Sequence, residues 1–188
     1  MTVRAQRRLR TMRQVQEVAL EAFEQRGFDA VSVEEIAQRA EVGTATVYRH
    51  FGTKERLVLW DAYDPMLFEG IAARLKGGDA PFQAMAGAVC DALGSFYERD
   101  KRLVLRRTDL AWRTPALRTA ALTDLNDLRE GLCRVLKPEV TDAFERDLMA
   151  AVFVTMLDRC IDDWRKNRAR TPLATIVRRA AKVVAKLG

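Results

Sequence analysis

The sequence has few of the residues from which enzyme and metal sites are built. It contains one histidine, His50, and three widely separated cysteines, Cys90, Cys133 and Cys160, with no CxxC pair. This pattern supports neither a zinc site nor a disulfide framework, and it fits a reducing cytoplasm. The single histidine lies in a short helical segment over about residues 44–50, so no Ser/His/Asp set can form in the rest of the chain. We therefore expect no catalysis, no cofactor and no metal.

Long apolar runs are also absent. No run approaches the roughly 18 apolar residues that span a membrane, and no apolar segment follows the N-terminal arginines. We therefore expect no membrane span, no secretory signal and a cytoplasmic location. There are only five prolines and no Pro/Gly/Ser-rich linker. An apolar fraction of 48% and a charged fraction of 31% are typical of a folded globular protein.

Positive charge is unevenly distributed along the chain. The net charge is +6, and the first 13 residues contain no acid but several arginines, namely Arg4, Arg7, Arg8, Arg10 and Arg13. Acids restore the balance between Glu17 and Glu41. A basic arm of this kind usually follows the phosphates of a nucleic acid, although a solvated tail has the same composition.

Almost every segment has the periodicity of an α-helix, and no alternating strand pattern with hairpin turns occurs. We therefore predict an all-α fold. Gly27 is placed to end a first helix. Thr53 is a natural N-cap for a fourth helix, which the apolar pattern extends to Leu75. Further helices follow, including a long one over about 141–168 and a last one to the C-terminus.

The second and third helices are short and are joined by a tight turn over residues 41–43. Ser32 and Glu35 form a capping box that opens the second helix, and the third covers about 44–50. Two short helices that span about 20 residues together with their turn have the geometry of a helix-turn-helix. The outward residues of the third helix are small, hydroxylic, aromatic or basic and include no acid: Thr44, Ala45, Thr46, Tyr48, Arg49 and His50. A helix that enters a major groove needs such residues.

The segment from Gly27 to Leu57 closely resembles the DNA-binding signature of tetracycline-repressor (TetR-type) regulators, above all in the run from Ala40 to Phe51. The resemblance implies an N-terminal helix-turn-helix domain over residues 1–56 and a helical domain over residues 57–188 that senses a small molecule and dimerises. It also implies a homodimer that reads a palindromic operator in double-stranded DNA. We expect a repressor rather than an activator. A helical protein-interaction module without sequence-specific DNA binding is the alternative.

Carried over by position, the resemblance assigns DNA contacts to individual residues. Phosphate contacts are expected from Tyr48, His50, Thr46 and Lys54, and base-edge contacts from Thr44, Ala45 and Arg49. Ser32 at the start of the second helix, and the arm residues Arg7, Arg8 and Arg10, complete the predicted surface. The sequence departs from the family at Glu41, where a glycine is usual, and at Gly43, where a serine cap is common. A left-handed Glu41 would be strained by about 1 kcal/mol.

The C-terminal part offers apolar and adaptable side chains for a ligand pocket. The candidates are Phe82, Met85, Phe96, Arg106, Asp109, Trp112, Met149, Phe153 and Met156. The apolar members have an alternative interpretation as ordinary core, and the polar ones as surface or ion-paired residues. An apolar or acyl-bearing effector is expected, which acts by moving the fourth helix. By the resemblance, the long helix over 141–168 and the last helix form the dimer faces.

Overall fold

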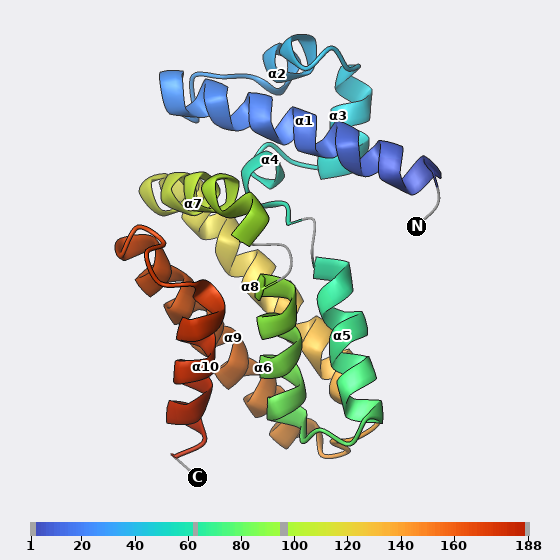
Figure 1. The fold of residues 1–188 in the computed structure, drawn as a ribbon. Coiled ribbons are helices and arrows are strands. Elements are labelled where there is room, and N and C mark those ends of the chain that lie inside the picture. The colour runs from blue at the N-terminus through green and yellow to red at the C-terminus, as the bar shows by residue number, and fades with distance from the viewer. Residues whose placement is uncertain (1–2, 62–63, 95–97, 187–188) are drawn as a thin grey trace. The chain divides into compact units, whose positions relative to one another are not determined.

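The computed structural model describes residues 3–61, 64–94 and 98–186, and these residues form helices without strands. The helices are α1 (Val3–Arg26), α2 (Val33–Arg39), α3 (Thr44–Phe51), α4 (Arg56–Leu59), α5 (Asp64–Lys76), α6 (Pro81–Ala92), α7 (Glu98–Arg113), α8 (Pro115–Leu136), α9 (Ala143–Lys166) and α10 (Leu173–Val184) (Figure 1). The predicted all-α fold is confirmed. None of these helices is both long and apolar enough to cross a membrane.

The chain divides into two compact units. The first contains Met1–Ala62 and Arg106–Ala121, and the second contains Tyr63–Leu105 and Leu122–Gly188. Helix α7 therefore contributes its first half to the second unit and its second half to the first. By packing, the first unit also includes residues 57–62 and parts of α7 and α8. The predicted domain boundary after residue 56 stays a prediction.

The first unit has a core built around α1. Helix α1 contacts both α2 and α4, and α2 packs on α3. The inward residues of these helices are almost completely buried, including Leu20, Phe23, Ile36, Val47 and Leu57. Gly27 ends α1 with a φ of 88°, as its position in the sequence predicts.

The second unit is a helical bundle. Helix α6 packs against both α5 and α10, and α9 packs against α10 (Figure 1). Its core contains Met85 and Phe153, both fully buried, and the ring of Phe82 meets the ring of Phe153 edge-on at 5.7 Å between centroids. The unit thus has a continuous apolar interior.

The predicted long fourth helix is wrong. Helix α4 ends at Leu59, because Trp60 has a ψ of 127° and leaves the helical region, and a separate helix α5 begins at Asp64. Pro65 explains why a single helix is unfavourable here, since proline lacks the backbone N–H that a helix continuing from α4 would need at this position.

The N-terminal arm is also structured. Its arginines lie on the first turns of α1, which runs without interruption from Val3 to Arg26. From Val3 onward the arm is therefore a helix, on which Arg4, Arg7, Arg8 and Arg10 are exposed to solvent. Their contact with phosphate stays a prediction.

Candidate nucleic-acid interface

Helix α2 is fixed at both ends by local sequence. Ser32 is its N-cap, and its Oγ accepts a hydrogen bond of 3.1 Å from the backbone N–H of Glu35, as the capping box predicts. The Glu35 carboxylate does not reach back to Ser32 but pairs with Arg26 at the end of α1. Arg26 also donates to the carbonyl of Ala30. Ser32 thus shapes the helix start, and its DNA contact stays a prediction.

The turn after α2 is a Schellman motif. The N–H of Val42 donates to the carbonyl of Ala37 at 3.0 Å, and the N–H of Glu41 donates to the carbonyl of Gln38 at 3.1 Å. Glu41 has a φ of 56°, so it occupies the left-handed position where glycine is favoured. The carbonyl of Ala40 in this turn accepts a hydrogen bond of 3.1 Å from the Gln14 side chain on α1.

Helix α3 is anchored by two buried residues, Val47 and Phe51, and begins at the N-cap Gly43. The Phe51 ring packs edge-on against the Trp60 ring, with 5.8 Å between centroids. This arrangement turns Ala45, Tyr48 and Arg49 to the surface, where the Tyr48 side chain is 46% exposed.

The sides of α3, the candidate recognition helix, are half-buried and polar. Thr44, Thr46 and His50 are partly covered, and the Arg49 guanidinium lies within 3.4 Å of the Thr46 hydroxyl, to which it donates. Lys54 follows the helix, and its ammonium lies 4.5 Å above the centre of the Phe28 ring. A cation held over an aromatic ring keeps its charge close to the surface.

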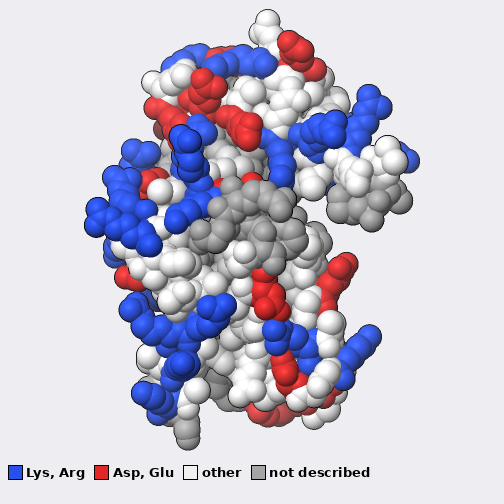
Figure 2. All heavy atoms as spheres, viewed as in Figure 1, with Lys and Arg blue, Asp and Glu red and all other residues white. Residues whose placement is uncertain are grey.

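Arg8, on the N-terminal part of α1, acts electrostatically on His50 of α3. Burial, then the charge of Arg8 and then the charge of Arg49 lower the pKa of His50 below its ordinary value. Arg8 is thus close enough to α3 to act on it electrostatically, which adds positive charge from the arm to that of Arg49. Figure 2 shows lysine and arginine side chains gathered around the N-terminal end of α1. Sequence periodicity did not reveal this proximity, because it depends on how α1 crosses α3.

The candidates for the ligand pocket fall into different parts of the structure. Met85 and Phe153 lie in the core of the second unit, with Phe82 and Met149 packed against that core. Met156 is also buried, and Phe96 lies outside the described residues. By contrast, Arg106, Asp109 and Trp112 belong to the first unit. The guanidinium of Arg106 is bound to Glu24 of α1, with nitrogen–oxygen distances of 2.6 to 3.1 Å.

These features define a helix-turn-helix protein with a separate helical unit. Residues 16–59 match the family described as bacterial regulatory proteins, tetR family. The chain is 32% identical over 160 residues to the HTH-type transcriptional regulator TcmR of Streptomyces glaucescens, an alignment that covers 79% of this chain and 70% of that protein. The chain therefore belongs to the TetR family of transcriptional regulators, as its sequence predicts.

Solved structures show the same fold. FadR of Thermus thermophilus, a TetR family transcriptional repressor solved in complex with lauroyl-CoA, has a TM-score of 0.59 at 22% identity, with 93% of both chains covered. NalD of Pseudomonas aeruginosa, the secondary repressor of the MexAB-OprM multidrug efflux pump, has a TM-score of 0.54 at 18% identity, with 94% of both chains covered. Members of the family bind operator DNA as homodimers and respond to small molecules, so this chain is a ligand-responsive regulator.

The strained turn gives a first testable prediction. Replacing Glu41 by glycine removes the left-handed strain, so the free energy of unfolding should rise by about 1 kcal/mol. Chemical denaturation measures this change. Glu41→Gln is the matched control, because it removes the charge but keeps the strain and should leave stability within about 0.5 kcal/mol of the wild type. Equal stabilisation by both variants would contradict the backbone explanation.

His50 gives a prediction about pH. Its pKa is lowered in the free protein, and a bound phosphate would raise it, so DNA binding should take up protons. Affinity should therefore increase as pH falls from 8 to 6, by up to about tenfold for each unit of pKa difference. Fluorescence anisotropy with operator DNA at fixed salt measures this dependence. His50→Gln should flatten the profile, and an unchanged profile in that variant would show that His50 does not contact phosphate.

Proposed function

We propose that this regulator is a repressor that binds a palindromic operator as a homodimer and is released by an apolar small molecule. The observation that carries the DNA-binding part is the surface of α3, where Tyr48 and Arg49 are exposed and no acid occurs in the helix. Such a surface suits phosphates and base edges together. In a two-fold dimer, two such helices would enter successive major grooves about 34–36 Å apart.

The proposed DNA contacts divide by role. Arg49 and the small residues Thr44 and Ala45 lie where base edges would be read, whereas Tyr48, Thr46, His50, Lys54 and the α1 arginines Arg7, Arg8 and Arg10 would bind phosphate. Arginine can donate two hydrogen bonds to the edge of a guanine, which makes Arg49 the strongest candidate for sequence discrimination. Phosphate contacts add affinity that depends on salt but not on sequence.

Repression and an apolar effector rest on relatives and on the second unit. FadR and NalD are described as repressors, and FadR binds lauroyl-CoA. The second unit of this chain has an apolar interior containing Phe82, Met85, Met149 and Phe153. These residues stay candidates for the effector pocket. Because the relatives are transcriptional regulators, we also propose that the chain has no catalytic activity. Since it would act by binding DNA, we propose that it works in the cytoplasm.

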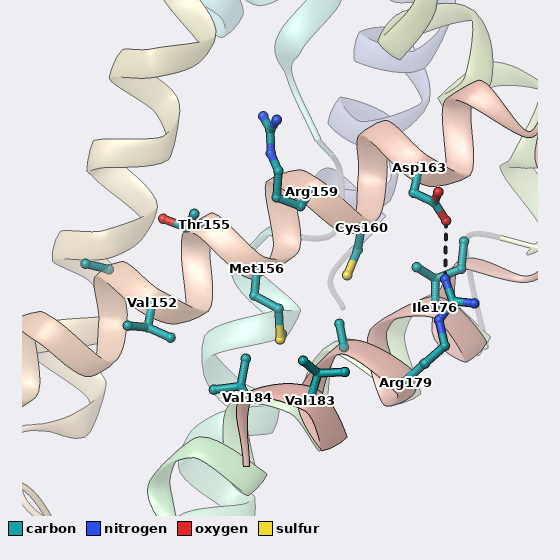
Figure 3. A pocket seen from close by; sticks show the side chains of 12 residues that line it. Val152, Thr155, Met156, Arg159, Cys160, Asp163, Ile176, Arg179, Val183 and Val184 are labelled. Carbon is teal, nitrogen blue, oxygen red and sulfur yellow. Dashed lines mark ion pairs between the residues drawn. The ribbon is translucent and has the colours of Figure 1, made fainter. Parts of the chain in front are cut away.

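We place the dimer surface on α9 and α10. A groove of about 640 Å³ lies between these helices, and its lining includes Val152 and Met156 from α9 and Ala180 and Val183 from α10. Figure 3 shows Met156 pointing from α9 toward α10. Val183 is 57% exposed and Val152 39% exposed. Exposed apolar side chains along such a groove suit packing of helices from a second copy.

The operator experiment tests DNA recognition directly. Genomic fragments from the source organism would be mixed with the protein at physiological salt, and the retained fragments sequenced. A recovered palindrome is expected. Arg49→Ala should weaken its binding by about 1–3 kcal/mol and relax preference at one position of each half-site. Tyr48→Phe should weaken all sequences alike.

Arg178→Ala provides the control, because it removes one exposed positive charge from α10 in the second unit. It should leave the recovered sequence and its affinity unchanged. If the folded wild-type protein retained no preferred sequence, the repressor proposal would be wrong and the interaction-module alternative would be favoured.

The dimer surface gives a separate prediction. Val152→Glu would bury an unpaired carboxylate between subunits, so the dimer dissociation constant should rise about 100-fold or more. Sedimentation velocity measures this constant. Leu122→Glu is the matched control, since Leu122 on α8 is 68% exposed and lies outside the groove. Loss of the dimer in the control, with Val152→Glu still dimeric, would move the interface away from α9 and α10.

A further inference from the structure

Two adjacent arginines of α7 bind different parts of the first unit. Arg106 pairs with Glu24 on α1, and both side chains are about a third exposed. Arg107 is much more enclosed. Its Nη1 donates to the carbonyl oxygen of Trp60 at 2.5 Å, and its Nη2 donates to the Asp61 carboxylate at 2.9 Å. The Arg107 and Asp61 side chains are only 12% and 13% exposed.

The Arg107 contacts fall at the point where the chain leaves α4. At this helix end, Gln16 of α1 donates to the carbonyls of Val58 and Trp60, at 3.4 and 2.9 Å. Gln16 is only 1% exposed. The Trp60 carbonyl therefore accepts hydrogen bonds from α1 and from α7 together, which fixes the backbone of this residue between two helices.

Trp60 also touches the recognition helix. Its ring meets the ring of Phe51 edge-on, and Phe51 is the last residue of α3 and is 6% exposed. A displacement of the Trp60 backbone would therefore move the surface on which the end of α3 rests. Tyr48 and His50 lie in that last turn of α3.

We propose that Arg107 is a positioning residue for DNA recognition, which holds Trp60 and thereby sets the orientation of α3 without touching DNA. The proposal rests on the proposed function, since it assigns to α7 the support of the recognition helix. The planar fork of arginine can donate to a carbonyl and a carboxylate at once, which lysine cannot do in the same geometry.

The test combines DNA affinity with a spectroscopic signal from Trp60. The chain has three tryptophans, so an NMR spectrum of the ¹⁵N-labelled protein contains three indole N–H signals, and Trp60→Phe identifies the one from Trp60. Arg107→Met should shift the Trp60 signal and weaken binding to the recovered operator at least tenfold at fixed salt. Arg107→Lys keeps the charge and one donor but not the fork, so it should show a smaller shift and a correspondingly smaller loss of affinity.

Arg113→Met is the matched control on the same helix. Arg113 is exposed, and its Nε donates only to the nearby backbone carbonyl of Asp109 on its own helix. This variant should leave the Trp60 signal unchanged and affinity within about twofold of the wild type. An equal loss of affinity in Arg113→Met would point to a general effect of charge and overturn the proposal.

The two proposals fail in different ways. If Arg107→Met folds and binds operator like the wild type, Arg107 is not a positioning residue, whereas the regulator function stands. If the wild type recovers no operator, the proposed function fails, and the Trp60 signal alone then decides whether Arg107 holds Trp60. An unshifted Trp60 signal in both Arg107 variants overturns the inference in either case. Should Arg107→Met not fold, Arg107→Lys supplies both measurements.

Discussion

A helix that ends inside a protein leaves carbonyl groups without partners, and the end of α4 shows how this constraint organises the first unit. Each shielded carbonyl left unpaired would cost about 1–3 kcal/mol. Gln16 and Arg107 satisfy these groups from two other helices. Because the hydrogen bonds have narrow geometry, they also determine where Trp60 lies, and Trp60 in turn supports the end of the recognition helix through Phe51.

Local signals in the sequence were sufficient for most of the DNA-binding unit. The N-cap of α2 at Ser32, the end of α1 at Gly27 and the start of α3 at Gly43 each depend on one or a few neighbouring residues, and the structure has all three where the sequence predicts them. The left-handed Glu41 was also recognisable, because the family pattern places glycine there. Local capping and turn chemistry thus locates the recognition helix without tertiary information.

The break after α4 could not be predicted in the same way. Apolar residues continue at helical spacing through Leu57 and Leu67, so periodicity alone favours one long helix. The signal against it was Pro65, which lacks the backbone N–H that a helix continuing from α4 would need. The hydrogen bonds that stabilise this break are tertiary contacts, since Gln16 and Arg107 lie 42 or more residues from the carbonyls they bind. A buried glutamine among the apolar positions of α1 was the one visible hint of such a role.

The ligand candidates show a further limit of periodicity, which reports that a helix face is buried but not what covers it. Arg106, Asp109 and Trp112 follow an apolar stripe of α7, yet this half of the helix belongs to the first unit, whereas Val104 belongs to the core of the second. One helix therefore serves both units. A largely enclosed ion pair such as Arg107–Asp61 contributes little net stability, because desolvation offsets the attraction, but losing one partner is costly. A contact with that balance is suited to fixing a geometry rather than to holding the fold together.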